Sequence, residues 1–266
     1  MTTKYKIGLR LRRANSTLNW LNSDAEETYS STTRLGPNLY RADEIEYKFN
    51  SHGFRCDEFN IVTTLPIVFS GCSITEGTGL HQHETWSYLL LEKIREKTNK
   101  IIPYWNIGVA ASSIDTQAEY LHWLTTTQNI NIKFIFGLFP PIYRRDLRIA
   151  SDKRRIWLPV NPSAPSEIWT DDVSRVFSDE FYAQHQTVRS MMIIDSICRL
   201  NRSKMFYTFW NKDPENDMFR DNFPFLNLLS LAEYENTDLA RDGHHFGPTY
   251  HSILAELYWA LVEPYF

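Results

Sequence analysis

Short apolar runs alternate with helix-like segments between residues 66 and 262, and this alternation constrains the fold more than any other feature. The runs are continuous and brief, which is typical of strands buried on both faces, whereas the segments between them space their apolar residues three and four apart. Such alternation predicts a parallel sheet with helices on both faces. The expected strands cover residues 66–71, 101–109, 132–140 and 204–210, and the expected helices cover residues 85–99, 113–127, 179–201 and 247–262.

Local signals mark two of the expected helix starts. Ser113 stands at an N-cap position, where its hydroxyl can accept a hydrogen bond from a first-turn N–H group. Pro248 suits the first turn of the last helix, because an N–H group there has no partner within the helix. The periodicity and the local signals therefore agree on both boundaries.

Composition and charge exclude several classes of protein. Apolar residues make up 42% of the 266 residues and charged residues 23%, which is ordinary for a globular protein with a full core. The net charge of −4 and the lack of a long basic block make nucleic acid a poor partner. No apolar run approaches the roughly 20 residues that span a bilayer, and the first residues lack the apolar core of a secretory signal. Three widely spaced cysteines argue against a disulfide framework, so we expect a cytoplasmic protein or one assembled inside the cell, such as a virion component.

The composition changes along the chain. Residues 1–60 are polar, with turn signals at "NSD", "LGPN" and "NSHGF", and we expect an N-terminal extension or arm packed on the main domain. The main α/β domain is expected to cover residues 61–266. Within it, residues 141–177 are rich in Pro, Arg and Trp without a clear period, which indicates an irregular insertion.

Four polar segments follow the predicted strands or precede the last helix. They are "GCSITEG", "NIGVAAS" and "PPIYRRD" after the first three strands, and "RDGHHFGP" before residue 249. In parallel sheets, ligands bind beyond the carboxyl ends of the strands. The four segments are therefore expected to meet at one site.

The residue types in these segments fit nucleophilic catalysis. Ser73 follows the first strand, and a serine hydroxyl becomes a good nucleophile when a base removes its proton and a third group orients that base. The last segment supplies Asp242, His244 and His245 for these tasks. The N–H groups of Ser73 and Gly108 can stabilise an oxyanion, and Gly108 has no side chain to block a substrate carbonyl.

These motifs resemble those of the SGNH/GDSL hydrolases, a family of serine esterases, lipases and acylhydrolases. "FSGCSITEG" resembles the first block of that family, "NIGVAASS" its glycine block and "DGHHFGP" its final D-x-x-H block. The lead-in "YKFNSHGFRCDEF" is similar to that of members from phage and environmental genomes, and the resemblance covers roughly residues 47–262. It implies a flavodoxin-like three-layer α/β/α fold, with a central and mostly parallel sheet of about five strands.

The resemblance also implies an esterase or deacylase that uses neither metal nor cofactor. By position, Ser73 is the nucleophile, His245 the base and Asp242 its partner, with Ser73 and Gly108 as oxyanion donors. The implied substrate is a small-molecule or carbohydrate ester, such as an O-acyl group on a carbohydrate.

Two positions depart from the family pattern. Cys72 replaces the usual Asp before the serine, and we interpret it as a small buried residue under the turn. The segment after the third strand, "FGLFPPIYRRD", lacks the usual oxyanion Asn, and loss of one such donor costs about 100- to 1000-fold in turnover. Arg144, Arg145 or another residue of 141–177 replaces it, or the protein is a slow enzyme or no enzyme.

Several residues have two interpretations. Arg144 and Arg145 bind an anionic substrate or form a solvated pair. Glu76 touches the substrate or is a solvated charge near a helix N-terminus. His244 contacts the substrate or is a rim residue. His81 and His83 are bystanders or, with His244 and His245, ligands of a metal-dependent hydrolase.

One alternative belongs to a different functional class. The chain is then a non-catalytic or weakly active binding or structural protein of a virion that keeps the fold. The N-terminal arm would join it to virion partners or to further copies of the chain.

Overall fold

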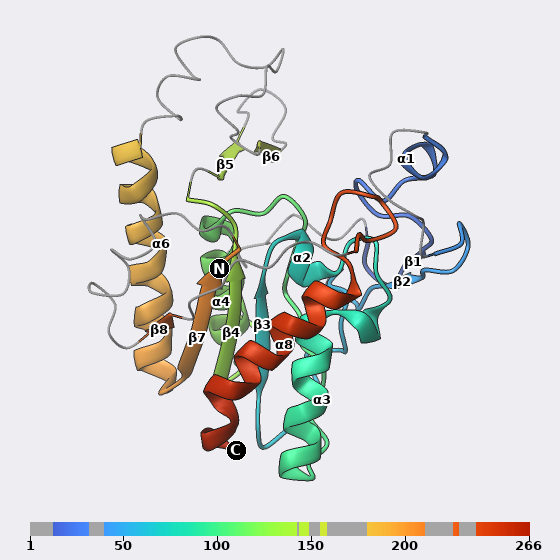
Figure 1. The fold of residues 1–266 in the computed structure, drawn as a ribbon. Helices are drawn as coiled ribbons and strands as arrows, with labels where there is room; N and C mark the ends of the chain where they lie inside the picture. The colour runs from blue at the N-terminus through green and yellow to red at the C-terminus, as the bar shows by residue number, and fades with distance from the viewer. Residues whose placement is uncertain are drawn as a thin grey trace.

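The computed structural model describes residues 13–31, 40–142, 144–148, 155–158, 180–210, 226–228 and 238–266 (Figure 1). For 145–148, 155–158, 180 and 226–228 it describes the backbone. The helices are α1 (Glu26–Ser30), α2 (Ser73–Glu76), α3 (Trp86–Thr98), α4 (Ile114–Thr126), α6 (Glu180–Asn201) and α8 (Pro248–Val262), with 3-10 turns at Gln82–Glu84 and Glu263–Tyr265. The strands are β1 (Thr17–Leu18), β2 (Tyr47–Lys48), β3 (Ile67–Gly71), β4 (Phe134–Phe139), β5 (Arg145–Arg148), β6 (Arg155–Leu158), β7 (Lys204–Phe209) and β8 (Leu226–Leu228).

The central sheet has the order β3-β4-β7-β8, and every pair in it is parallel. Residues 105–109 extend the sheet beyond β3, because the Ile107 N–H donates to the Phe69 carbonyl at 2.8 Å and the Val109 N–H to the Gly71 carbonyl at 3.0 Å. Counted along the chain, the five segments then lie in the order 2-1-3-4-5, which is the flavodoxin-like order. The predicted α/β fold with a parallel sheet is confirmed.

The side chains of the strands alternate between two helical layers. Val68 and Ile135 lie in the core cluster with α4 and α6, whereas Phe69 and Phe136 lie in the cluster with α3 and α8. In Figure 1, α8 crosses the front of the sheet and α4 lies behind it. Burial on both faces explains why the strand sequences are continuously apolar.

Helix boundaries follow the local signals. The Ser113 hydroxyl caps α4 by accepting a hydrogen bond from the Thr116 N–H at 3.4 Å, and Pro248 lies in the first turn of α8. The predicted strand 101–109 is not a regular strand: it forms a single β-bridge, between Phe69 and Asn106. β8 was not predicted, because a strand of three residues is too short to show a period.

The described part of the N-terminal segment packs on the α/β core. β1 pairs with β2, and the segment lies beside α2 and the loop before α8 (Figure 1). A small apolar cluster joins them, formed by Leu21, Tyr40, Ile45, Tyr47, Phe49, Leu80 and Ala240. Of the predicted insertion 141–177, the structure describes residues 141, 142 and 144 and the antiparallel pair of strands β5 and β6. No helix among the described residues has the length and apolar character needed to cross a membrane.

The aromatic stack of the sheet gives a test of the core. The Phe136 ring is fully buried, with ring centroids 5.5 Å from Phe69 and 5.8 Å from Phe206. Phe136→Ala should lower the free energy of unfolding by about 3–5 kcal/mol, because it removes buried contacts and leaves a cavity. Urea denaturation measures the change. Phe181→Ala on α6 is the control, because that side chain is 72% exposed, and an equal loss in both variants would contradict this core.

Candidate active site

Ser73 lies at a tight turn between β3 and α2. A Cβ atom added at Gly71 would lie 2.2 Å from Thr75 Oγ1 and 2.4 Å from the Leu138 carbonyl oxygen, so only glycine fits at the end of the strand. Cys72 is 1% exposed and packs in the core with α3 and α8, as the sequence predicted. Ser73 is the first residue of α2 and is 8% exposed. The turn thus places the Ser73 hydroxyl at the carboxyl edge of the sheet.

The structure brings Ser73, His245 and Asp242 into one hydrogen-bonded chain. His245 Nε2 lies 2.7 Å from Ser73 Oγ, and His245 Nδ1 lies 2.6 Å from Asp242 Oδ2. Ser73 and His245 are 172 residues apart in the sequence. This is the geometry in which a carboxylate orients an imidazole and the imidazole removes a proton from a serine.

The Asp242 carboxylate is fully buried and accepts four hydrogen bonds. The N–H groups of His244 and His245 each donate to Oδ1 at 3.0 Å. Oδ2 accepts from the Ser23 hydroxyl at 2.7 Å and from the His245 ring. Burial by itself would raise the pKa of Asp242, but the hydrogen bonds and charge of His245 and the two N–H donors hold it well below its ordinary value. Asp242 therefore stays ionised, and His245 Nδ1 carries the proton that faces it.

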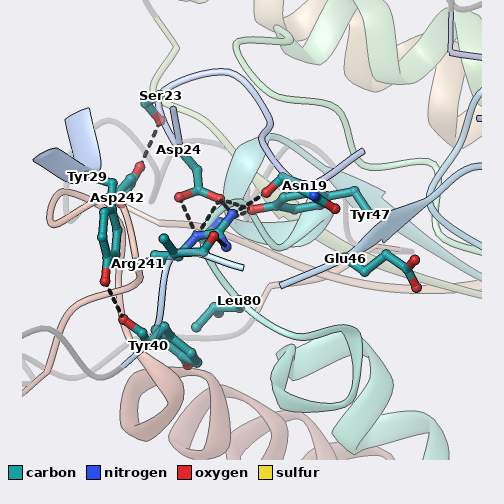
Figure 2. A network of polar contacts seen from close by, with 12 residues as sticks. Asn19, Ser23, Asp24, Tyr29, Tyr40, Glu46, Tyr47, Leu80, Arg241 and Asp242 are labelled. Carbon is teal, nitrogen blue, oxygen red and sulfur yellow. Dashed lines mark hydrogen bonds and ion pairs between the residues drawn. The ribbon is translucent and has the colours of Figure 1, made fainter. Parts of the chain in front are cut away.

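A buried ion pair fixes the loop that carries Asp242 and His245. The guanidinium of Arg241 binds both carboxylate oxygens of Asp24, with the Nη2–Oδ2 distance at 2.6 Å, and neither side chain is exposed. It also lies 4.1 Å from the centre of the Trp20 ring and donates to the Ala42 carbonyl at 2.9 Å. Figure 2 shows this network, in which Asp24 and Ser23 of the N-terminal segment face Arg241 and Asp242.

The prediction that the Gly108 N–H is an oxyanion donor is wrong. This N–H donates to Asn106 Oδ1 at 2.8 Å and is therefore not available to a substrate. A Cβ atom at this position would lie 2.8 Å from the backbone nitrogen of Glu76 and from Thr75 Cβ. Gly108 is thus required for close packing against α2. The Ser73 N–H, at the first position of that helix, has no acceptor within it.

A turn over residues 109–112 lies beside α2 and offers a different donor. The Ser112 N–H donates to the Val109 carbonyl at 3.1 Å, and the Ala110 N–H to Glu76 Oε2 at 2.7 Å. Ala111 has a φ of 61°, and its N–H has no acceptor among the described residues. Sequence reasoning missed Ala111, because a positive φ is signalled by glycine and not by alanine.

Glu76 is not the solvated or substrate-contacting residue that the sequence predicted. It is 2% exposed, and its carboxylate accepts from Arg13 Nη1 at 2.9 Å, from Asn22 Nδ2 at 3.3 Å and from the Ala110 N–H. Protein donors therefore hold both of its oxygens. Glu76 joins the N-terminal segment to α2 and to the turn over residues 109–112.

The remaining predicted site residues are not part of the hydrogen-bonded chain of Ser73, His245 and Asp242. His244 is exposed next to His245, and Arg144 is half-buried after β4, where its N–H donates to the Pro141 carbonyl at 3.0 Å. Arg145 begins β5, and its side chain lies outside the described residues.

The histidines that the sequence offered as metal ligands lie in two separate places. The His81 and His83 rings stack with centroids 5.2 Å apart, and His81 Nε2 lies 3.6 Å from Glu44. His244 and His245 lie on the loop before α8 that also carries Asp242. Within the part of the chain that the structure describes, no three His, Cys, Asp or Glu residues are grouped so as to hold a metal ion.

Comparison with known proteins gives only weak likenesses. No family model and no curated protein matches this chain. Among solved structures, the crystal structure of TesA has a TM-score of 0.49 and 14% identity, covering 75% of this chain and 98% of that one. The psychrotrophic esterase EstA from Pseudoalteromonas sp. has a TM-score of 0.47 and 11% identity, covering 75% and 97%. The acetyl xylan esterase AlAXEase has a TM-score of 0.45 and 12% identity, covering 74% and 100%. At these scores the likenesses carry no argument about family or activity, so the functional inference rests on the geometry of the site.

The buried His251 of α8 predicts that the stability of the protein depends on pH. His251 is 1% exposed, and its Nδ1 accepts a hydrogen bond from the Trp86 N–H at 2.9 Å. Burial, and secondarily the charge of His245, lower the pKa of His251 from 6.5 to about 3. The unfolded chain therefore binds one more proton than the folded protein between these two values. The stability that this group contributes is complete above pH 6.5 and is lost as the pH falls toward 3.

His251→Asn should remove this component, which is about 1.4 kcal/mol per pH unit across that window. Urea denaturation from pH 4.5 to 7.5, in about one-unit steps, measures the slope. His122→Asn at an exposed position of α4 is the control and should keep the wild-type slope. An unchanged slope in His251→Asn would contradict the assignment.

Glu76 predicts a second stability effect. Glu76→Gln should lower the free energy of unfolding by about 1–3 kcal/mol, because buried donors lose a charged acceptor. Urea denaturation measures it. Glu256→Gln is the matched control, since Glu256 is 60% exposed in its 2.8 Å pair with Lys93, and such pairs contribute little. Equal losses in the two variants would show that Glu76 has no special role.

Proposed function

We propose that this protein is a serine hydrolase that cleaves esters through Ser73, His245 and Asp242. The observation that carries the proposal is the pair of short contacts of the His245 ring, 2.7 Å to Ser73 Oγ and 2.6 Å to Asp242 Oδ2. A serine, a histidine and a buried ionised aspartate aligned in this way form an activated nucleophile. This alignment favours an enzyme over the non-catalytic alternative.

The proposed reaction has two steps. In the first, His245 Nε2 takes the proton of Ser73 while Oγ bonds to the acyl carbon, and the ester alcohol leaves with that proton. In the second, His245 takes a proton from water, the hydroxide oxygen attacks the acyl-serine, and the proton returns to Ser73 as the acid leaves. Asp242 stays ionised throughout and stabilises the transient imidazolium.

The oxyanion is stabilised by the N–H groups of Ser73 and Ala111. Both groups are free of acceptors among the described residues, and the Ala110–Glu76 hydrogen bond holds the Ala111 turn beside α2. Asn106 is not a third donor, because its amide donates to the Thr75 carbonyl at 2.5 Å and to the Tyr104 hydroxyl at 2.7 Å. Arg144, which follows β4 at the same sheet edge, is one of the predicted replacements for the absent family Asn, with Arg145 and the other residues of 141–177.

The substrate class that we propose is an O-acylated carbohydrate or a related small ester. The resemblance of the sequence blocks to the SGNH/GDSL hydrolases supports it. Most of the predicted irregular insertion 141–177, including residues 149–154 and 159–177, lies outside the described residues.

Hydrolysis of a short-chain p-nitrophenyl ester tests the proposal. Ser73→Ala should lower kcat/KM by about 10⁴-fold or more, because the nucleophile and its proton transfer are both lost. Ser196→Ala is the control, because that exposed hydroxyl on α6 donates only to the Met192 carbonyl at 2.7 Å among the described contacts. Activity that survives a chelator would remove the metal-dependent alternative. Wild-type turnover by Ser73→Ala would overturn the proposal.

A further inference from the structure

We propose that Ser23 is a positioning residue of the active site, holding the Asp242 carboxylate in the orientation that His245 requires. The inference rests on the proposed function for its catalytic meaning. Its structural part, a link from the N-terminal segment to the triad, stands on contacts that do not depend on the reaction.

Ser23 lies at the tip of a tight turn. The Leu21 N–H donates to the Asp24 carbonyl at 2.8 Å, and the Asp24 N–H donates to the Leu21 carbonyl at 3.0 Å. Asn22 has a φ of 57°, a value that Asn tolerates better than most residues. The chain therefore reverses over Asn22 and Ser23, at the "NSD" turn that the sequence predicted.

Three consecutive residues of this turn contact three parts of the site. The Asn22 side chain donates to Glu76 on α2 at 3.3 Å, and Asp24 forms the buried ion pair with Arg241. Between them, the Ser23 hydroxyl donates to Asp242 Oδ2 at 2.7 Å, as Figure 2 shows. The turn is thus fixed on both sides of Ser23.

The ion pair on the Asp24 side is itself rigidly held. Tyr47 of β2 donates its hydroxyl to Asp24 Oδ2 at 2.5 Å and accepts from the Gly79 N–H at 2.8 Å. Arg241 and Asp242 are neighbours in the chain, so the pair sets the position of the loop that Ser23 contacts. Ser23 is therefore presented to Asp242 with little freedom.

The contact matters because of where it falls on the carboxylate. Oδ1 is held by two N–H groups of the loop itself, whereas Oδ2 is shared by the His245 ring and by Ser23. Two donors on Oδ2 fix the plane of the carboxylate toward His245 Nδ1. A hydroxyl donating to a buried carboxylate is among the stronger hydrogen bonds in proteins. The active site therefore includes a side chain about 50 residues before the nucleophile, outside the region that carries the family motifs.

The loss of Ser23 has a signed effect on His245. Without this donor, the negative charge on Oδ2 is less compensated, so a protonated His245 becomes more favourable. Other ionisable groups near the pair include His244, which is exposed and next to His245 in the chain, the mutually compensated Asp24 and Arg241, and His251 on α8. Burial, and secondarily the charge of His245, lower the pKa of His251 to about 3, so it is neutral where His245 is studied. The midpoint of the His245 titration should therefore move to higher pH in Ser23→Ala.

The experiment compares the full-length wild type with Ser23→Ala, Ser23→Thr and Ser31→Ala. NMR of histidine-labelled protein reads the His245 titration, and a His245→Gln spectrum assigns its signals. The pH profile of kcat/KM for a p-nitrophenyl ester is measured alongside. Ser31→Ala is the matched control, because its hydroxyl donates to the Thr28 carbonyl at 2.9 Å at the end of α1.

We expect Ser23→Ala to raise the His245 midpoint, to move the acidic limb of the kcat/KM profile in the same direction and to lower kcat/KM by about tenfold. Ser23→Thr keeps the hydroxyl and should restore all three values, and Ser31→Ala should match the wild type. If Ser23→Ala does not fold, Ser23→Cys, a weaker donor, should give an intermediate shift.

A His245 midpoint in Ser23→Ala that equals the wild-type value would overturn the inference, whatever the change in rate. A lower rate with an unmoved midpoint would likewise show a merely structural role. The titration needs no substrate. A wild type that hydrolyses no ester would therefore overturn the proposed function while leaving the Ser23 contact separately tested.

Discussion

The site depends on the hydrogen bonds that the buried Asp242 carboxylate accepts. A buried charge is costly unless hydrogen bonds or opposite charges compensate it, and here four donors meet that requirement. Two of these donors are backbone N–H groups that form the loop, one is His245, and one is Ser23 from the N-terminal segment. The same hydrogen bonds that make the charge tolerable also determine which way the imidazole faces.

The parallel sheet brings the other half of the site to this carboxylate. β3 ends at Gly71, where the close approach of Thr75 and the Leu138 carbonyl leaves no room for a side chain, and α2 begins at once with Ser73. The segment over residues 105–109 runs alongside β3 and delivers the turn that contains Ala111 to the same edge. Chain topology therefore brings Ser73 and the turn that contains Ala111 to the edge where His245 and Asp242 lie.

Much of this arrangement could be predicted from the sequence. Continuous apolar runs and the caps at Ser113 and Pro248 determined the layers and the helix starts, since burial and end effects act on neighbouring residues. Ser73, Asp242 and His245 could be predicted because residues at strand ends and before the last helix must meet at one sheet edge. The resemblance to the SGNH/GDSL motifs then implied His245, and not His244, as the partner of Ser73.

The errors share a physical cause, which is that a residue's hydrogen-bond partner leaves no signal in the sequence pattern, whether it lies two residues away or far along the chain. Gly108 was expected to donate to a substrate, but Asn106 two residues away takes its N–H. Glu76 was expected to face solvent, but Arg13 and Asn22 from the N-terminal segment bind it. The role of Ser23 depends on Asp242, which is 219 residues away in the chain. The N-terminal segment was expected to be an extension or arm packed on the main domain, and its described part also supplies contacts to the site.

The central claim is that Ser73 is an activated nucleophile within an intact triad. Reaction with a fluorophosphonate, followed by peptide mass spectrometry, tests this claim without assuming a substrate. We predict a covalent adduct on Ser73 in the wild type, and its loss or strong slowing in His245→Gln. An unlabelled protein, or an adduct that forms on Ser73 at the same rate without His245, would contradict the account.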